Sequence, residues 1–125
     1  MAYSRPSFKQ KYGNYIGGKW VDPVGGQYFD NLSPIDGELI AQMPRSNADD
    51  VNLALDAAHK AAATWNHTSA VERSIILNKI ADRIEENAEA IALAETCDNG
   101  KPIRETLAAD IPLTIDHFRF FASVI

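Results

Sequence analysis

Apolar residues recur every three or four positions on both sides of one short junction, residues 96–102. This spacing is close to the period of an amphipathic helix, so it predicts two helices that meet at the junction. Asn99 and Gly100 tolerate the positive φ of a helix C-terminus, and Pro102 suits the first position of the next helix. The apolar positions are Leu77, Ile80, Ile84, Ala88 and Ile91 before the junction, and Ile103, Leu107, Ile111, Ile115 and Phe118 after it.

The first third of the chain has a different pattern, in which short apolar runs alternate with turn residues. Gly17-Gly18 has the composition that a two-residue hairpin turn requires, and residues 33–37 form a second turn-rich stretch. We therefore expect β-hairpins over residues 13–44, after an N-terminal tail of residues 1–12. The strands are expected at residues 15–16, 19–21, 28–29 and 38–43.

The first helix is predicted to begin at Ser46 as N-cap. Asp49 and Asp50 then place negative charge in its first turn, which favours the helix dipole. The helix should end near Trp65 and bury one face, whose alanines indicate close approach of a partner element. That face carries Val51, Ala54, Leu55, Ala58, Ala61, Ala62 and Trp65.

A second helix is predicted to open at Ser69, because Ser69 and Glu72 have the spacing of a capping box. Asn87 either divides this helix from a shorter one that ends at Cys97 or lies in one continuous, mildly bent helix. The apolar positions of the second helix are Ile75, Ile76, Leu77, Ile80, Ala81 and Ile84.

The last segment, residues 102–125, contains an internal proline. Pro112 removes one helical hydrogen bond and crowds the carbonyl of Ala108, at a cost of about 3 kcal/mol if nothing compensates. We therefore expect a kink near residues 108–112. Residues 118–125 are apolar on more than one face and lack a C-capping signal, so they need a partner surface, and the complete protein is expected to continue beyond them.

Composition is that of an ordinary globular protein: 125 residues, 46% hydrophobic and 23% charged. The net charge of -5 argues against nucleic acid as a partner, since a phosphate-binding surface needs clustered Lys and Arg. No apolar run approaches the roughly 20 residues that span a bilayer, so no membrane segment is expected and the cytoplasm is the expected location. Cys97 is the single cysteine, which excludes an intramolecular disulfide, and the three histidines are too dispersed for a zinc site.

These patterns together predict an α+β fold, with short antiparallel β-hairpins over residues 13–44 followed by three or four helices over residues 46–125. Several of its motifs, in this order and spacing, resemble the N-terminal quarter of the NAD(P)-dependent aldehyde dehydrogenase superfamily. The motifs are Tyr15-Ile16-Gly17-Gly18-Lys19-Trp20, Ser33-Pro34-Ile35-Asp36-Gly37, Ala57-Ala58 with Trp65, Arg73, Ile80-Ala81-Asp82 and Asp98-Asn99-Gly100-Lys101-Pro102.

A later stretch is similar to one branch of that superfamily. Residues 109–113 and 116–121 resemble the bacterial acetaldehyde dehydrogenases, which act on short aliphatic aldehydes. The resemblance implies an enzyme that oxidises such an aldehyde to the carboxylic acid with NAD or NADP, as a homodimer or homotetramer. The family's catalytic cysteine, oxyanion-hole asparagine, glutamate and dinucleotide-binding units lie beyond residue 125. The chain itself is therefore expected to be architectural and inactive alone, as the N-terminal part of the α/β aldehyde dehydrogenase fold.

The resemblance also implies roles for four residues of this chain. Asp98, with the backbone carbonyl of Leu32, matches positions that help hold a monovalent or hard cation, for which oxygen ligands are appropriate. The alternative for Asp98 is a carboxylate that binds the amides starting the next helix. Leu113 matches a position that lines the substrate entry tunnel, and His117 lies one turn later; a packing role for Leu113 and an interfacial role for His117 are the alternatives.

Two other side chains have a structural interpretation. Cys97 stands at a predicted helix C-terminus beside Asp98, and both features disfavour a reactive thiolate. Arg119 is expected to pair with a carboxylate or stack on an aromatic ring.

A second hypothesis belongs to another functional class. The apolar end at residues 118–125 is also what a stand-alone helical interaction module without catalysis would present to its partner. A glycine-rich βαβ segment and a later cysteine motif, further along the reading frame, would favour the enzyme.

Overall fold

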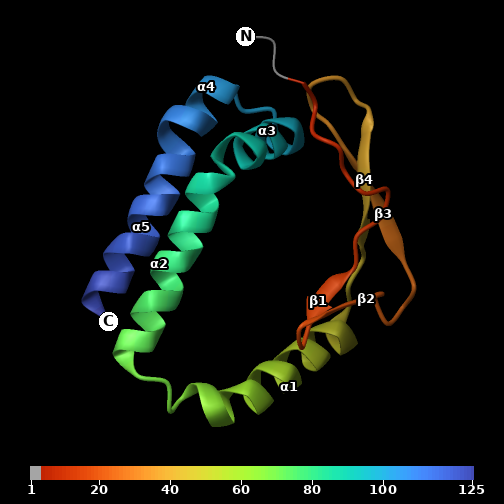
Figure 1. Cartoon of the computed structure of the whole chain (residues 1–125). Coiled ribbons are helices and arrows are strands. Elements are labelled where there is room, and N and C mark those ends of the chain that lie inside the picture. Colours follow the sequence, from red (N-terminus) through yellow and green to blue (C-terminus); the bar gives the residue numbers. More distant parts are fainter. Residues whose placement is uncertain (1–3) are drawn as a thin grey trace. The chain divides into compact units, whose positions relative to one another are not determined.

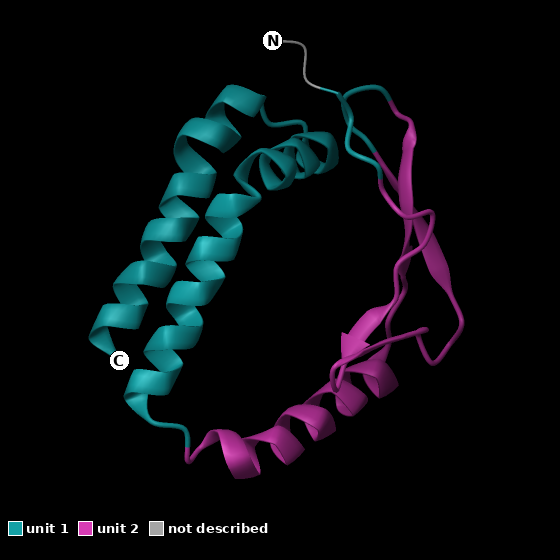
Figure 2. Cartoon of the chain, in the orientation of Figure 1, with its two compact units in different colours: residues 1–7, 33–36, 68–125 teal, residues 8–32, 37–67 magenta. Residues whose placement is uncertain are grey.

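The computed structural model describes residues 4–125, which form two compact units (Figures 1 and 2). One unit holds residues 4–7, 33–36 and 68–125, and the other holds residues 8–32 and 37–67. Two antiparallel hairpins are followed in the chain by helices, which confirms the predicted α+β class. Residues 1–3 of the predicted tail lie outside the described residues.

The predicted glycine hairpin is present. Strands β1 (Asn14–Ile16) and β2 (Lys19–Val21) pair antiparallel. Gly17 and Gly18 both have positive φ, 59° and 81°, as the tight turn between twisted strands requires. Tyr15 pairs with Trp20 across the strands, and their ring centroids lie 5.1 Å apart.

The second predicted hairpin is also present, formed by β3 (Tyr28–Leu32) and β4 (Leu39–Pro44) with an irregularity at Asn31 and Leu32. The end of the segment expected as a tail runs beside β4. The Tyr12 amide donates to the Gln42 carbonyl at 3.0 Å, and the Gln42 amide donates to the Gln10 carbonyl at 2.9 Å. Residues 10–12 are therefore hydrogen bonded to this hairpin.

Helix α1 (Ala48–Trp65) ends where predicted but begins one residue later than expected. Asn47 is the N-cap, and its side chain accepts hydrogen bonds from the amides of Asp49 and Asp50. The prediction of Ser46 was wrong, because the Ser46 hydroxyl instead donates to Asn14 at 2.9 Å. The capping box is completed by Asp50, which accepts from the Asn47 amide at 2.9 Å.

The face of α1 predicted to be buried is largely exposed in this chain. Val51, Leu55 and Trp65 are about half exposed, at 54%, 50% and 46%. Within its own unit α1 packs mainly on β1, and a three-residue strand is too small to cover an 18-residue helix. The prediction of burial was therefore wrong for the chain taken by itself.

Helix α2 (Ala70–Glu86) opens with the predicted capping box, in which Ser69 and Glu72 exchange hydrogen bonds. Asn87 separates α2 from α3 (Ala88–Asn99), so the divided helix is the correct one of the two alternatives. Gly100 then ends α3 in the left-handed conformation, with its amide donating to the Thr96 carbonyl at 2.9 Å.

The last helical stretch consists of α4 (Ile103–Glu105), the π-helical turn η1 (Thr106–Asp110) and α5 (Ile111–Val124). Pro102 is the N-cap of α4 rather than its first residue; its carbonyl accepts hydrogen bonds from the amides of Glu105 and Thr106. A π turn over residues 106–110 stands where the kink was expected near residues 108–112.

Helices α2 and α5 lie side by side, as Figure 1 shows. Their contact supplies much of a small core made of Ala81, Ala92, Ile111 and Ile115. Ala81 and Ala92 are fully buried, which lets the helix backbones approach closely. In the part of the chain that the structure describes, no helix is both long and apolar enough to cross a bilayer.

Arg119 binds two carboxylates of α2, Asp82 at 3.2 Å and Glu85 at 2.5 Å. This result confirms the first of the two roles expected for Arg119. The Ser74 hydroxyl adds a second link between the helices by donating to the Ala122 carbonyl at 2.6 Å. The two helices are thus joined by polar contacts outside their apolar core.

Replacing Gly100 with alanine should destabilise the helical unit by about 2 kcal/mol, because φ of +78° is costly for an L-residue and the new Cβ would lie 3.1 Å from Pro34 Cγ. The matched control is Gly37→Ala. Gly37 also has positive φ, but its new Cβ would meet no described atom within 4 Å, so about 1 kcal/mol is expected. Urea unfolding followed by circular dichroism measures both, and equal losses would contradict a role for the Pro34 contact.

Candidate functional site

Helix α5 has two apolar faces, and the predicted substrate residues lie on the outer one. Ile111 and Ile115 point into the core at 4% and 7% exposure. At about 100° per residue, Leu113 and His117 lie roughly opposite that face. Leu113 is 54% exposed and His117 is also exposed. Phe120 and Val124 continue the same outer face and are exposed as well.

The π turn before α5 determines which residues belong to each face. Ile103, Leu107, Ile111 and Ile115 follow one another at intervals of four, and all four pack in or against the core. In a regular α-helix this spacing would drift by about 120° between Ile103 and Ile115. A π turn takes up one extra residue and reduces the drift to about 20°. The four isoleucine and leucine positions therefore stay on one face.

Both ends of the π turn are tied to neighbouring structure. At its start, the fully buried Thr106 donates its hydroxyl to the Ile103 carbonyl at 3.0 Å, and its oxygen lies 3.3 Å from that of Thr96 in α3. At its end, the Asp110 carboxylate binds the Lys101 ammonium group. This hydrogen bond raises the pKa of Lys101, so its ammonium group stays protonated near neutral pH.

Lys101 is itself held in place at the junction. Its backbone amide donates to the Asn99 side chain at 2.8 Å, directly after the Gly100 turn. Asn99 is thus the side chain that receives this amide, and the two roles considered for Asp98 stay predictions. Asp98 lies exposed in the last turn of α3.

Cys97 is half-buried near the end of α3. It lines a hollow of about 250 Å³ together with Leu93, its neighbour one turn earlier. These surroundings support the packing role proposed from the sequence.

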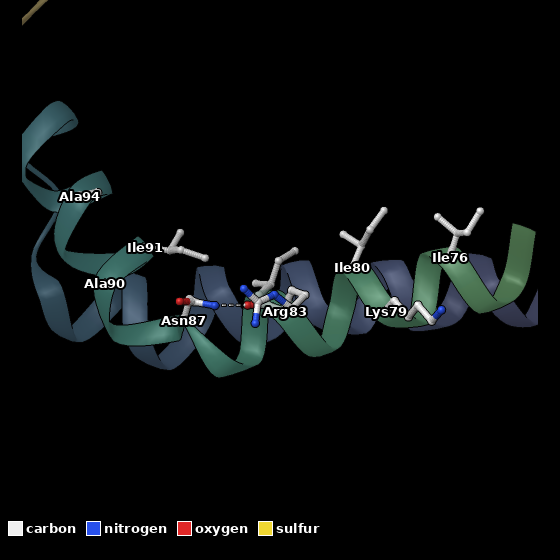
Figure 3. A pocket seen from close by; sticks show the side chains of 9 residues that line it. Ile76, Lys79, Ile80, Arg83, Asn87, Ala90, Ile91 and Ala94 are labelled. Atoms are coloured by element: carbon white, nitrogen blue, oxygen red, sulfur yellow. Dashed lines mark hydrogen bonds between the residues drawn. The ribbon is translucent and has the colours of Figure 1, made fainter. Parts of the chain in front are cut away.

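A wider groove of about 820 Å³ runs along α2 and α3, and Figure 3 shows Ile76, Ile80 and Ile91 projecting on one side of it. Lys79 and Arg83 border this apolar surface. The Asn87 side chain, where the two helices meet, donates to the Arg83 carbonyl at 2.8 Å. The groove offers apolar contact area and cations, and no carboxylate, cysteine or histidine lines it.

Residues 20–125 match the aldehyde dehydrogenase family. This chain belongs to the aldehyde dehydrogenase family. The match covers most of the chain and confirms the family suggested by the motifs.

Two relatives and one solved structure illustrate the similarity within this family. The acetaldehyde dehydrogenase of Pseudomonas aeruginosa is 63% identical over 119 residues, which cover 95% of this chain and 24% of the relative. The long-chain-aldehyde dehydrogenase of an Acinetobacter species is 62% identical over 122 residues, which cover 98% of this chain and 24% of the relative. The crystal structure of PnpE, from Pseudomonas sp. WBC-3, in complex with nicotinamide adenine dinucleotide is 41% identical with a TM-score of 0.89, covering 93% of this chain and 24% of that chain.

This aldehyde dehydrogenase chain thus spans about a quarter of the length of the curated relatives it matches. The described residues do not fit a dinucleotide phosphate site. The adjacent glycines Gly17 and Gly18 join two antiparallel strands, whereas a phosphate cradle needs a glycine-rich turn from strand to helix. The connection from β4 to α1, residues 45–47, has no glycine, and Asp49 and Asp50 at the start of α1 would repel a pyrophosphate.

The cation site expected at Leu32 and Asp98 remains a prediction. Leu32 is the last residue of β3 and Asp98 belongs to α3, and the two residues lie in different compact units. Within residues 4–125, no group of three or more His, Cys, Asp or Glu side chains is arranged to hold a metal ion. A cation here would therefore depend on carbonyl or water oxygens in addition to Asp98.

Sequence reasoning missed two polar arrangements in this aldehyde dehydrogenase segment. The first is the ion pair between Lys101 and Asp110 at the end of the π turn; the three successive intervals of four from Ile103 to Ile115 were a signal for the turn itself. The second is the buried carboxylate of Asp50, which accepts from the Val24 amide at 2.9 Å and from the Asn14 side chain at 3.3 Å. With the Asn47 bond, three donors converge on Asp50, so its role is to join α1 to the hairpin region.

Asp50→Asn should lower stability most at neutral pH. The hydrogen bonds that Asp50 accepts, chiefly those from the Asn47 and Val24 amides, lower the pKa of Asp50 below its ordinary value of 3.8. Its stabilisation is therefore present above about pH 4 and is lost as the pH falls through the lowered pKa. The difference between wild type and variant in urea midpoint should be large at pH 7 and shrink at pH 3.

Asp49→Asn is the matched control, because it removes the same charge from the same helical turn. It should change the urea midpoint less than Asp50→Asn at pH 7. A difference for Asp50→Asn that stays constant from pH 7 to pH 3 would contradict the role assigned to the ionised Asp50.

Proposed function

We propose that this chain is the N-terminal part of an enzyme that oxidises an aldehyde to the carboxylic acid with NAD or NADP. The match of residues 20–125 to the aldehyde dehydrogenase family carries the proposal. The proposed enzyme is cytoplasmic and assembles as a homodimer or homotetramer. Nothing in the acidic composition favours nucleic acid as a partner.

The chain's own contribution is architectural, and α5 is the element that we place beside the substrate. A helix that packs on one side only is ordinarily polar on the other. The outer face of α5 instead presents Leu113, Phe120 and Val124, with His117 between them. We assign Leu113 and His117 to the wall of the passage through which the aldehyde enters, where an apolar wall excludes water and favours the aliphatic part of the substrate.

The proposed substrate is a short aliphatic aldehyde, such as acetaldehyde. Over the region compared, the chain is as similar to a relative named for acetaldehyde as to one named for long-chain aldehydes, at 63% and 62% identity. The substrate length therefore depends on individual wall residues rather than on overall similarity. The Leu113 side chain is branched and bulky enough to leave room for a short aliphatic aldehyde and to restrict a longer one.

The bond-making steps are assigned to residues outside this chain. Cys97 is not given a catalytic role, because it stands at a helix C-terminus beside Asp98 and lines a hollow with Leu93. NAD or NADP would be held by residues outside this chain and would supply the hydride acceptor for the oxidation. The residues described here would position α5 and help exclude water from the aldehyde. Leu32 and Asp98 are proposed to contribute oxygens to a monovalent cation.

A stand-alone interaction module remains the alternative, and the groove along α2 and α3 is the observation that favours it. Its apolar lining and bordering cations are features of a protein contact surface. A module of this kind would bind its partner without any aldehyde-dependent reduction of NAD.

The longest reading frame that contains this chain should reduce NAD or NADP when an aldehyde is added, while residues 1–125 alone should not. The reason is that the isolated chain lacks the expected nucleophile and dinucleotide site. Absorbance at the reduced-nicotinamide band measures both proteins. Turnover by residues 1–125 alone would contradict the architectural role, and an inactive longer protein would favour the interaction module.

Leu113→Ala in the longer protein should raise kcat/KM for six- to ten-carbon aldehydes about tenfold relative to acetaldehyde, because it removes branched carbon atoms from the proposed wall. Val124→Ala is the control: it shortens a residue on the same outer face about three turns further along α5. Initial rates over an aldehyde length series measure the ratio. Equal effects of the two variants, or none for Leu113→Ala, would remove Leu113 from the passage.

A further inference from the structure

The π turn sets the rotation of α5 about its own axis. If the same residues formed a regular α-helix, the extra residue of the π turn would no longer be taken up within one turn, and every α5 side chain would rotate by about 100° relative to Ile103. Leu113 would then move from its position opposite the core toward the side of the helix. The identity of the outer face therefore depends on five residues, Thr106–Asp110.

Pro112 excludes a regular helix here but does not by itself select the π turn. Its ring would crowd the Ala108 carbonyl in an α-helix, which a simple kink, a break or a π turn would each relieve. In the π turn, the Ile111 amide reaches back five residues to the Thr106 carbonyl. A further constraint is needed to choose this arrangement.

The Lys101–Asp110 ion pair supplies this constraint at the C-terminal end of the π turn. Asp110 is the last residue of the π turn, and its carboxylate binds an ammonium group held at the Gly100 junction nine residues earlier. The first residue, Thr106, is already fixed by buried hydrogen bonds. Holding both ends in place restrains the conformation of the residues between them. The pair is 41% and 27% exposed, so it is sheltered enough to hold the geometry.

We propose that Lys101 and Asp110 are positioning residues for the aldehyde passage, because their ion pair holds the π turn that turns Leu113 and His117 away from the core. This inference rests on the proposed function for its consequence in catalysis. Its structural part, the link between the ion pair and the π turn, stands independently. The two parts are tested by different measurements on the same variants.

The experiment uses the longest reading frame that contains the chain, with Lys101→Met, Asp110→Asn and the exchanged pair Lys101→Asp with Asp110→Lys. Hydrogen exchange of the amides of residues 107–111 should be about fivefold faster in each single variant, the size expected for a half-exposed pair, and should return toward wild type in the exchanged pair. KM for acetaldehyde should rise about fivefold in the single variants while kcat stays within about twofold.

Glu86→Gln is the matched control. It breaks the Arg83–Glu86 pair, with its 2.7 Å contact, which lies in the same compact unit and includes no residue of the π turn. It should change neither exchange at residues 107–111 nor KM by more than about twofold. An equal effect from this control would show that the response is general destabilisation and would overturn the proposal.

The outcomes separate the two parts of the inference. Unchanged exchange in both single variants overturns the positioning role, whatever the kinetics. Faster exchange with unchanged KM overturns the link to the aldehyde passage. A parent protein that is inactive with every aldehyde contradicts the proposed function, and the exchange data then still decide whether Lys101 and Asp110 hold the π turn.

Discussion

Pro112 constrains the conformation of the helical segment that contains it, and through that segment the packing of the helical unit. Proline has no amide hydrogen and its ring crowds the carbonyl four residues earlier, so the helix after the Gly100 junction cannot run straight through. The chain accommodates this with a π turn over Thr106–Asp110, and that turn keeps Ile103, Leu107, Ile111 and Ile115 on one face. The contact of α5 with α2, and with it the small core, depends on this one extra residue.

Because the core contains small residues, much of the chain's apolar area lies outside it. Ala81 and Ala92 are fully buried where helices approach closely, but alanine contributes little apolar area. Much of the larger apolar surface, on α1, along the groove of α2 and α3, and on the outer face of α5, stays exposed in this chain. In the proposed enzyme these are the surfaces that the substrate and the other parts of the protein would contact.

The features predicted correctly are those set by neighbours along the chain. The Gly17-Gly18 turn needs two adjacent residues with positive φ, and the capping box at Ser69 and Glu72 needs two residues within one helical turn. The N-cap of α1 was misplaced by one residue, because Ser46 and Asn47 are both good caps and the choice between them is made by Asn14, which binds Ser46. The burial predicted for α1 failed because a periodic pattern shows which face is apolar and not whether another element covers it.

The sequence by itself determined the two hairpins, the end of α1, the start of α2, the division at Asn87 and the family, because turns, caps and motif order are encoded in short stretches. Only the tertiary structure decided that the irregularity at Pro112 is a π turn, that Lys101 binds Asp110, and that Asp50 is a buried carboxylate with donors from Asn14 and Val24. These contacts join residues 9 to 36 positions apart. Pairings at that separation follow from how the elements pack, so local pattern and propensity do not specify them.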